Sequence, residues 1–147
     1  MKYDKNNYPE FIKQKSPPSP IIKNVLRAFL VGGLICVAGQ FFKNYYTGLG
    51  LSTLEVGTAN SITMVFVGAL LTALGLYGKI AKFAGAGTLV PITGFANSIT
   101  APAMEFKPEG LILGVGVKMF SIAGPVIVYG TVTSMLYGVI LYLAQML

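Results

Sequence analysis

The chain has 147 residues, of which 54% are hydrophobic and only 11% are charged. Soluble domains carry about 25% charged residues, so this composition excludes an ordinary soluble domain and predicts an integral membrane protein. Histidine is absent and Cys36 is the single cysteine, which removes the usual acid–base catalyst, most metal sites and any disulfide within the chain. We therefore expect neither an enzyme nor a bound cofactor.

The formal net charge is +6, and much of it lies near the start of the chain. Basic segments also occur in nucleic-acid-binding proteins. Here, however, a long apolar run follows directly, and basic residues beside a first membrane helix are typical of the cytoplasmic side. We predict a basic, proline-containing cytoplasmic tail over residues 1–24 and a single transmembrane helical domain over residues 25–147. The expected partner is the lipid bilayer, and no nucleic acid is expected.

The first membrane span is expected over about residues 25–42, and the second over residues 56–78. Small residues recur at helical spacing on both, which lets neighbouring helices approach closely. We predict helix-packing positions at Gly32 and Gly39 on the first span and at Gly68 and Gly75 on the second. Lys79 and Lys82 follow the second span, return the chain to the side of the tail, and are candidates for an anion-attracting mouth.

Residues 83–104 are uncharged and long enough to cross a bilayer, yet five glycines and prolines interrupt them. Proline removes a backbone donor and glycine loosens a helix. In hydrocarbon every freed N–H and C=O group needs a partner, so such a segment is tolerated where it is buried in protein or faces water. The segment either crosses fully or enters and turns back near Pro91.

This interrupted segment is the candidate lining of a solute path. The predicted lining residues are Gly85, Gly87, Thr88, Pro91, Thr93, Asn97 and Ser98. Asn97 has a structural alternative, because its amide could pair with a carbonyl group that Pro91 or Gly94 leaves free. The serine and threonine hydroxyls could likewise bond to their own helix.

The turn EFKPEG at residues 105–110 has a charge of about −1, which weakly favours the outer side. From residue 111 onward the only charge is Lys118, which either faces the path or reaches back to the interface. A helix over residues 111–147 would be about 55 Å long, so we expect it to break at Gly124-Pro125. Beyond that break, Gly130, Ser134 and Gly138 form a further predicted packing face. The expected fold is all-α, with about four membrane segments, at least one of them broken or re-entrant.

Four stretches resemble the SpoVA family of spore membrane proteins. They are GGLICVAGQ (residues 32–40), LLTALGLYGKIAKFAGAGTLVPITGFANS (70–98), EFKPEG (105–110) and IAGPVIVYG (122–130). The resemblance implies a place in the spore inner (forespore) membrane. It also implies movement of dipicolinic acid, largely as calcium dipicolinate, into the developing spore and out again on germination. The implied partners are the AE-type membrane subunit and the soluble AD-type subunit.

The leading functional hypothesis is a passive channel subunit, with tension as its gating stimulus. An ion-coupled transporter is an alternative, although no carboxylate lies inside any expected span. A non-conducting scaffold of the dipicolinate machinery is another. Because one small chain has few spans with which to enclose a path, we expect an oligomer or a hetero-complex.

Overall fold

The structure is a computed structural model that describes Ile12 and residues 19–146. Most of the expected tail, residues 1–24, therefore lies outside the described residues. The described part of the chain is helical and contains no strand, which confirms the all-α prediction. Its elements are α2 (Ile21–Gly48), α3 (Thr53–Ala73), α4 (Tyr77–Ala84), α5 (Ala86–Leu89), α6 (Ile92–Glu105), the 3₁₀ helix η1 (Lys107–Glu109), the π-helix η2 (Leu111–Gly116) and α7 (Val117–Met146).

Three of these segments are long and apolar enough to cross a membrane: Ile21–Gly48, Thr53–Ala73 and Leu111–Met146. The class of a multi-helix membrane protein is thus supported. The interrupted stretch between the second and third of these segments forms the short helices α4, α5 and α6.

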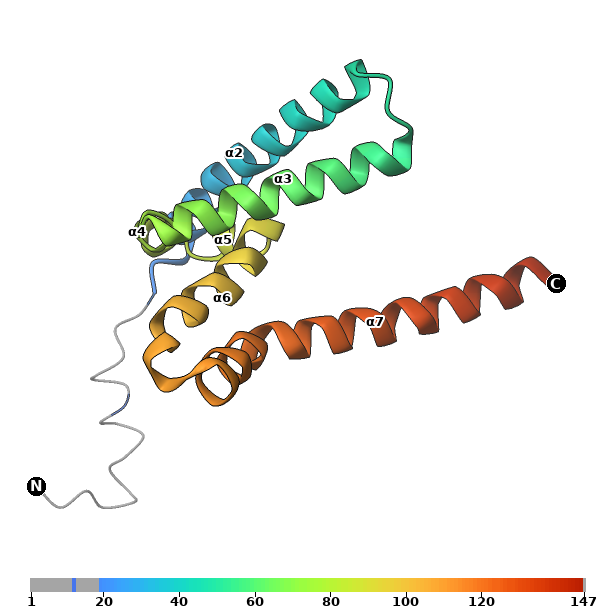
Figure 1. Ribbon diagram of the computed structural model, residues 1–147. Helices are drawn as coiled ribbons and strands as arrows, with labels where there is room; N and C mark the ends of the chain where they lie inside the picture. Colours follow the sequence, from blue (N-terminus) through green and yellow to red (C-terminus); the bar gives the residue numbers. More distant parts are fainter. Residues whose placement is uncertain (1–11, 13–18, 147) are drawn as a thin grey trace, which may run out of the picture.

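Helices α2 and α3 pack side by side as a hairpin (Figure 1). Ser52 begins α3 with a capping box: its backbone N–H donates to the Glu55 carboxylate at 2.9 Å, and its side chain accepts from the Glu55 N–H. Such a cap satisfies backbone donors that the first helical turn leaves free. Near the same end of the hairpin, the hydroxyl groups of Tyr46 and Thr63 lie 2.7 Å apart and join the two helices.

Gly75 is not on a packing face, contrary to the sequence prediction. Helix α3 ends at Ala73, and Gly75 follows it with φ +69° and no neighbour within 4 Å of where a Cβ would lie. This left-handed conformation is readily available to glycine because it lacks a Cβ. The residue therefore makes the turn into α4, and the second span ends earlier than expected.

The chain breaks within residues 83–104, where the sequence placed helix-breaking residues. Gly85 separates α4 from α5 with φ +54°, and Pro91 adopts an extended conformation before α6. Pro102, by contrast, lies inside α6. The broken segment therefore has two breaks, at Gly85 and Pro91, and a longer helix after them.

Helix α6 runs parallel to α3. A Cβ on Gly68 would lie 2.9 Å from the Cα of Thr93, and one turn further the hydroxyl of Thr72 lies 3.0 Å from the amide oxygen of Asn97. The residue numbers thus rise together along the two helices. The EFKPEG turn after α6 therefore lies beyond the end of α3 that leads into α4, and not at the opposite end of the hairpin (Figure 1).

The expected break at Gly124-Pro125 is wrong, because α7 continues through it from Val117 to Met146. A proline restricts the residue before it through that residue's Cβ, and Gly124 has none. The irregular backbone lies earlier, in the π-helix η2. There Gly110 has φ +95°, and Gly114 lies so close to the Phe106 carbonyl oxygen that a Cβ would be 2.6 Å from it.

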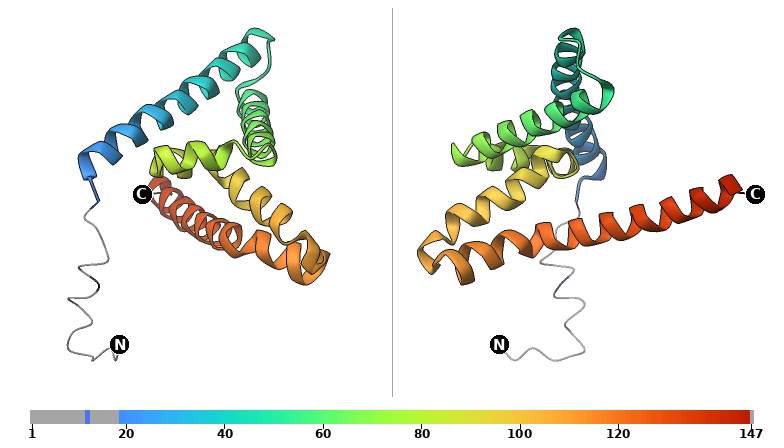
Figure 2. Two further views of the ribbon diagram at one scale, coloured as in Figure 1. Left: turned by 90° about the vertical axis from the view of Figure 1, so that its left-hand side faces the viewer. Right: turned by 45° about the vertical axis from the view of Figure 1, so that its right-hand side comes forward.

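Beyond its first turns α7 leaves the other helices and projects alone (Figures 1 and 2). Ala123 is its one buried residue among those described. Gly130 and Gly138 have no neighbour within 4 Å of a would-be Cβ, and Ser134 between them is exposed. Among the described residues, therefore, none packs on this predicted face.

We expect Gly68→Ala to destabilise the protein, because the new methyl group would press on the backbone of Thr93. Overpacking of this kind typically costs ~1–3 kcal/mol. Thermal unfolding in detergent, followed by circular dichroism, measures the effect. Gly57→Ala is the matched control, since it changes a glycine of the same helix that faces open space. Equal midpoints for the two variants would contradict the close contact between α3 and α6.

Candidate functional site

The broken segment borders a hollow of about 340 Å³ between α4, α5, α6 and the first turns of α7. Four of the predicted path residues line it: Gly85, Thr88, Asn97 and Ser98. The structure adds further lining residues from all four helices: Tyr77, Ala81, Leu89, Gly94, Ala101, Pro102, Glu105 and Ile122.

Tyr77 fixes the break from inside the protein. Its hydroxyl donates to the backbone carbonyl oxygen of Thr88 at 2.8 Å and lies 3.0 Å from the hydroxyl oxygen of Thr93. All three side chains are buried, with 2–3% of their surface exposed. The hydroxyl of Thr88 in turn donates to the Gly85 carbonyl oxygen at 3.0 Å. Two carbonyl groups beside the breaks are thus paired within the protein, as a non-helical backbone at membrane depth requires.

Asn97 lines the hollow and is held by a contact with α3. The Thr72 hydroxyl donates to the Gly68 carbonyl oxygen at 2.7 Å and lies 3.0 Å from the Asn97 amide oxygen. Asn97 therefore pairs with a side chain of α3 and not with a carbonyl group freed by Pro91 or Gly94. Ser98 bonds to its own helix, through the Phe95 carbonyl oxygen at 2.8 Å.

The other predicted path residues face elsewhere. Gly87 presses against Ala28 so closely that a Cβ would overlap the Ala28 backbone, and Pro91 lines a separate groove beside α2. Thr93 is buried beneath Tyr77. The broken segment thus has one face toward the hollow and another toward α2.

Both glycines predicted to pack on the first span lie against neighbouring residues. A Cβ on Gly32 would be 3.2 Å from the Gly87 carbonyl oxygen, and one on Gly39 would be 3.8 Å from the Met64 side chain. The α2 contact with Gly87 and the α3 contact with Thr93 hold the broken segment from two sides.

The three candidate cations lie outside the hollow. The Lys118 ammonium sits over the ring of Phe106, 4.6 Å from its centroid, at the end of the bundle beside the EFKPEG turn. Lys79 and Lys82 are exposed on α4, whose other face carries Tyr77 and lines the hollow. A cation over an aromatic ring is held electrostatically by the ring, so Lys118 is held beside the EFKPEG turn.

Sequence reasoning missed Tyr77, Glu105 and Ile122 as parts of the site. Tyr77 falls within the end of the second span expected over residues 56–78, and its position shortly before the interrupted segment was the one local indication of its role. Glu105 and Ile122 reach the hollow because α6 turns back into α7 there. No local pattern carries that information.

The residues that line the hollow carry one amide, three hydroxyl groups and one carboxylate beside apolar side chains. This set suits hydrogen bonding to water or to a polar solute. Among the described residues, no three histidine, cysteine, aspartate or glutamate side chains come together as a metal site would need.

The model of the SpoVAC/SpoVAEB sporulation membrane protein family matches residues 24–140, from the first turn of α2 to the last turns of α7. Stage V sporulation protein AC of Bacillus subtilis (strain 168) is 45% identical over 137 residues, which cover 92% of this chain and 91% of that protein. No solved structure matches the chain.

The matched region includes every element that surrounds the hollow. It also includes the four stretches on which the family resemblance was based, and that resemblance is confirmed. The chain therefore belongs to the SpoVAC/SpoVAEB family of sporulation membrane proteins.

Proposed function

We propose that the chain is a subunit of a membrane channel for dipicolinic acid, taken up during sporulation and released during germination. The solute and the spore inner (forespore) membrane come from the family resemblance. The observation that supports a channel is the break between α5 and α6. This break lies beside α2 and α3 and borders a hollow with polar groups. Non-helical backbone at membrane depth is typical of permeation and binding elements.

In this proposal α5 and α6 form a re-entrant hairpin and not a crossing. Because α6 runs parallel to α3, it leaves the bundle at the end where α4 enters. Seven basic residues follow residue 22 in the sequence, and only Lys43 lies at the other end of the bundle. A full crossing would carry Lys107 and Lys118 to the outer side, whereas the re-entrant arrangement keeps six basic residues on the cytoplasmic side. The positive-inside rule therefore favours three crossings with one re-entrant hairpin.

One subunit does not enclose a path. On one side the hollow is bordered only by the first turns of α7, and α7 then leaves the other helices (Figure 2). The exposed small residues on α7 are suited to close contact with another membrane helix. We place the contact with a further membrane subunit there, either a second copy or the AE-type subunit. The soluble AD-type subunit would meet the complex outside the bilayer.

In this proposal η2 is the element that responds to membrane tension. A π-helix is rare, has poorer hydrogen-bond geometry than an α-helix, and is frequent at functional sites. Here it joins α6, which lines the hollow, to α7, which spans the membrane. A thinner bilayer favours more tilted helices, and tilting of α7 about η2 would widen the hollow at Ile122.

The re-entrant arrangement predicts the side on which each turn is labelled. On a Cys36→Ser background, we expect Lys107→Cys and Lys79→Cys to react with a membrane-impermeant maleimide from the same side of sealed vesicles. Ser52→Cys, in the turn between α2 and α3, serves as the control for the other side. Labelling of Lys107→Cys together with Ser52→Cys would mean that residues 83–104 cross the membrane fully.

The channel hypothesis predicts release of dipicolinate from loaded liposomes that contain the purified chain, after an osmotic downshift. We expect Asn97→Leu to slow this release about tenfold, because a hydrogen bond to a charged group is worth ~1.5–3 kcal/mol. Asn44→Leu is the matched control, since Asn44 lies near the other end of α2 and pairs with Gln40. Release no faster than from empty liposomes would contradict the channel.

Subunit contact through α7 predicts that leucine at Gly130, Ser134 and Gly138 abolishes cross-linking between membrane subunits. Val132→Leu with Val139→Leu is the control, because these residues lie on the opposite face of the same helix. Equal losses in both variants would contradict the proposed contact. Lost cross-linking combined with no release by the unmodified chain would favour the scaffold function.

A further inference from the structure

A groove runs along α2 on the side away from the polar hollow. Its first part, about 320 Å³, lies between the start of α2 and the turn from α4 to α5. Its second part, about 420 Å³, continues along α2 beside α5. Ala28 and Ala86 line both parts, so the two parts form one continuous groove.

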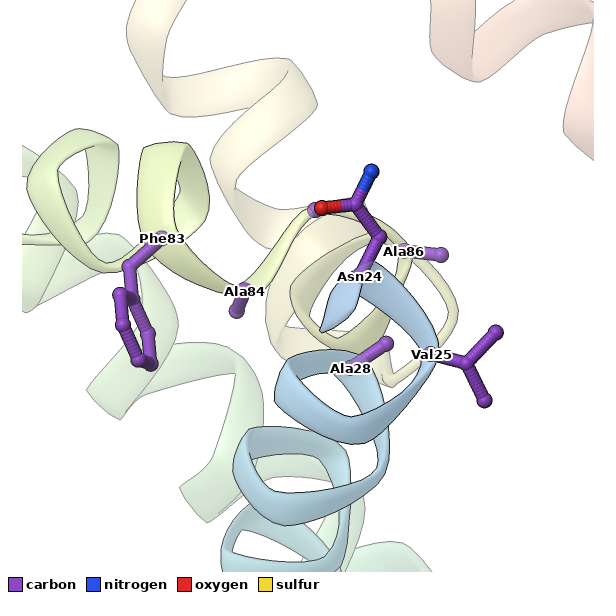
Figure 3. A pocket seen from close by; sticks show the side chains of 7 residues that line it. Asn24, Val25, Ala28, Phe83, Ala84 and Ala86 are labelled. Carbon is purple, nitrogen blue, oxygen red and sulfur yellow. The ribbon is translucent and has the colours of Figure 1, made fainter. Parts of the chain in front are cut away.

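The first part of the groove has a polar, cationic rim. Asn24 and Phe83 line it (Figure 3). The Arg27 guanidinium lies over the Phe83 ring, 4.7 Å from the ring centroid. Lys23 and Lys82 are exposed and adjoin Asn24 and Phe83 in the sequence. On α2 to α5 the only carboxylate is Glu55, at the far end of the hairpin. Within α2 to α5 the positive charge at this rim therefore has no nearby counter-charge, while Glu105 of α6 lines the neighbouring hollow, which shares Gly85 with the groove.

The second part of the groove is apolar. It is lined beside α2 by Phe29, Gly33 and Cys36 and closed on the other side by Val90. Gly33 leaves open space, since nothing lies within 4 Å of a would-be Cβ. From Asn24 to Cys36 the groove covers 12 residues, about 18 Å of helix, which matches the ~15 Å depth of one leaflet.

We infer that this groove binds one anionic phospholipid of the cytoplasmic leaflet. Its phosphate lies at the rim between Asn24 and Arg27, and one acyl chain follows α2 toward Cys36. Cationic sites between membrane helices on the cytoplasmic side suit acidic head groups. A small dicarboxylate solute would use the rim but would leave the apolar part empty. The continuity of the two parts therefore favours a lipid.

The test is native mass spectrometry of the full chain in detergent, titrated with dioleoyl phosphatidylglycerol or dioleoyl phosphatidylcholine. We expect phosphatidylglycerol to bind more tightly. Arg27→Gln should weaken its binding about fivefold, the value expected for one basic residue near a membrane surface. Lys43→Gln, at the opposite end of the same helix, is the matched control and should change little.

Two further variants test whether lipid binding depends on the shape of the groove or only on its positive charge. Asn24→Leu keeps the net charge and should still weaken phosphatidylglycerol binding, and Gly33→Leu should do the same by filling the acyl groove. Both positions accept a larger side chain, because Asn24 is exposed and Gly33 faces open space.

Three results would overturn the inference. One is equal binding of the two lipids, and another is an equal effect of Arg27→Gln and Lys43→Gln. The third is displacement of phosphatidylglycerol by millimolar dipicolinate while Gly33→Leu has no effect, which would make the rim a solute mouth. Since binding is measured without transport, failure here leaves the proposed channel untouched, and failure of release leaves the lipid site untouched.

Discussion

The hydrogen bonds of the buried Tyr77 side chain stabilise the break in the chain between α4 and α6. A buried backbone group that leaves a helix needs another hydrogen-bond partner, and between α4 and α6 the protein supplies one. The Tyr77 hydroxyl does so for the Thr88 carbonyl group and reaches Thr93 at the start of α6. With both sides of the break tied to one side chain, α6 is placed on α3, and the hollow takes its position between α4 and α7.

Glycine makes this placement sterically possible. Between membrane helices there is no strong hydrophobic driving force, and packing relies on close approach. Gly68 admits the backbone of Thr93 on one side of the broken segment, and Gly87 admits the backbone of Ala28 on the other. The segment is therefore clamped between the two helices of the hairpin, and its two faces differ. One borders a hollow with polar groups, and the other closes a groove along α2 whose character changes from cationic to apolar.

Helix α7 has a different status from the rest of the fold. It is joined through a π-helix, packs against α6 near its start, and then runs free of the other helices. An isolated apolar helix is stable in lipid because its backbone groups are paired within it. Among the described residues Gly130 and Gly138 have no close neighbour and Ser134 is exposed, which leaves a small-residue face suited to contact with another helix. The same separation makes η2 the natural place for α7 to move relative to the hollow.

The sequence by itself determined the membrane class, the all-α fold, the interruption of residues 83–104 with a break near Pro91, and the family. Low charge, long apolar runs and clustered helix-breaking residues act locally, so composition and spacing report them directly. The tertiary structure decided that Gly75 is a turn, that Pro125 does not end α7, and that α6 runs parallel to α3. It also decided that Asn97 and Ser98 share a hollow while Gly87 and Pro91 face α2. Helical spacing shows which residues share a face but not the direction in which the helix runs or the neighbour that the face meets. The direction and the neighbour are set by contacts between residues distant in the sequence, such as Tyr77 with Thr93 and Gly68 with α6.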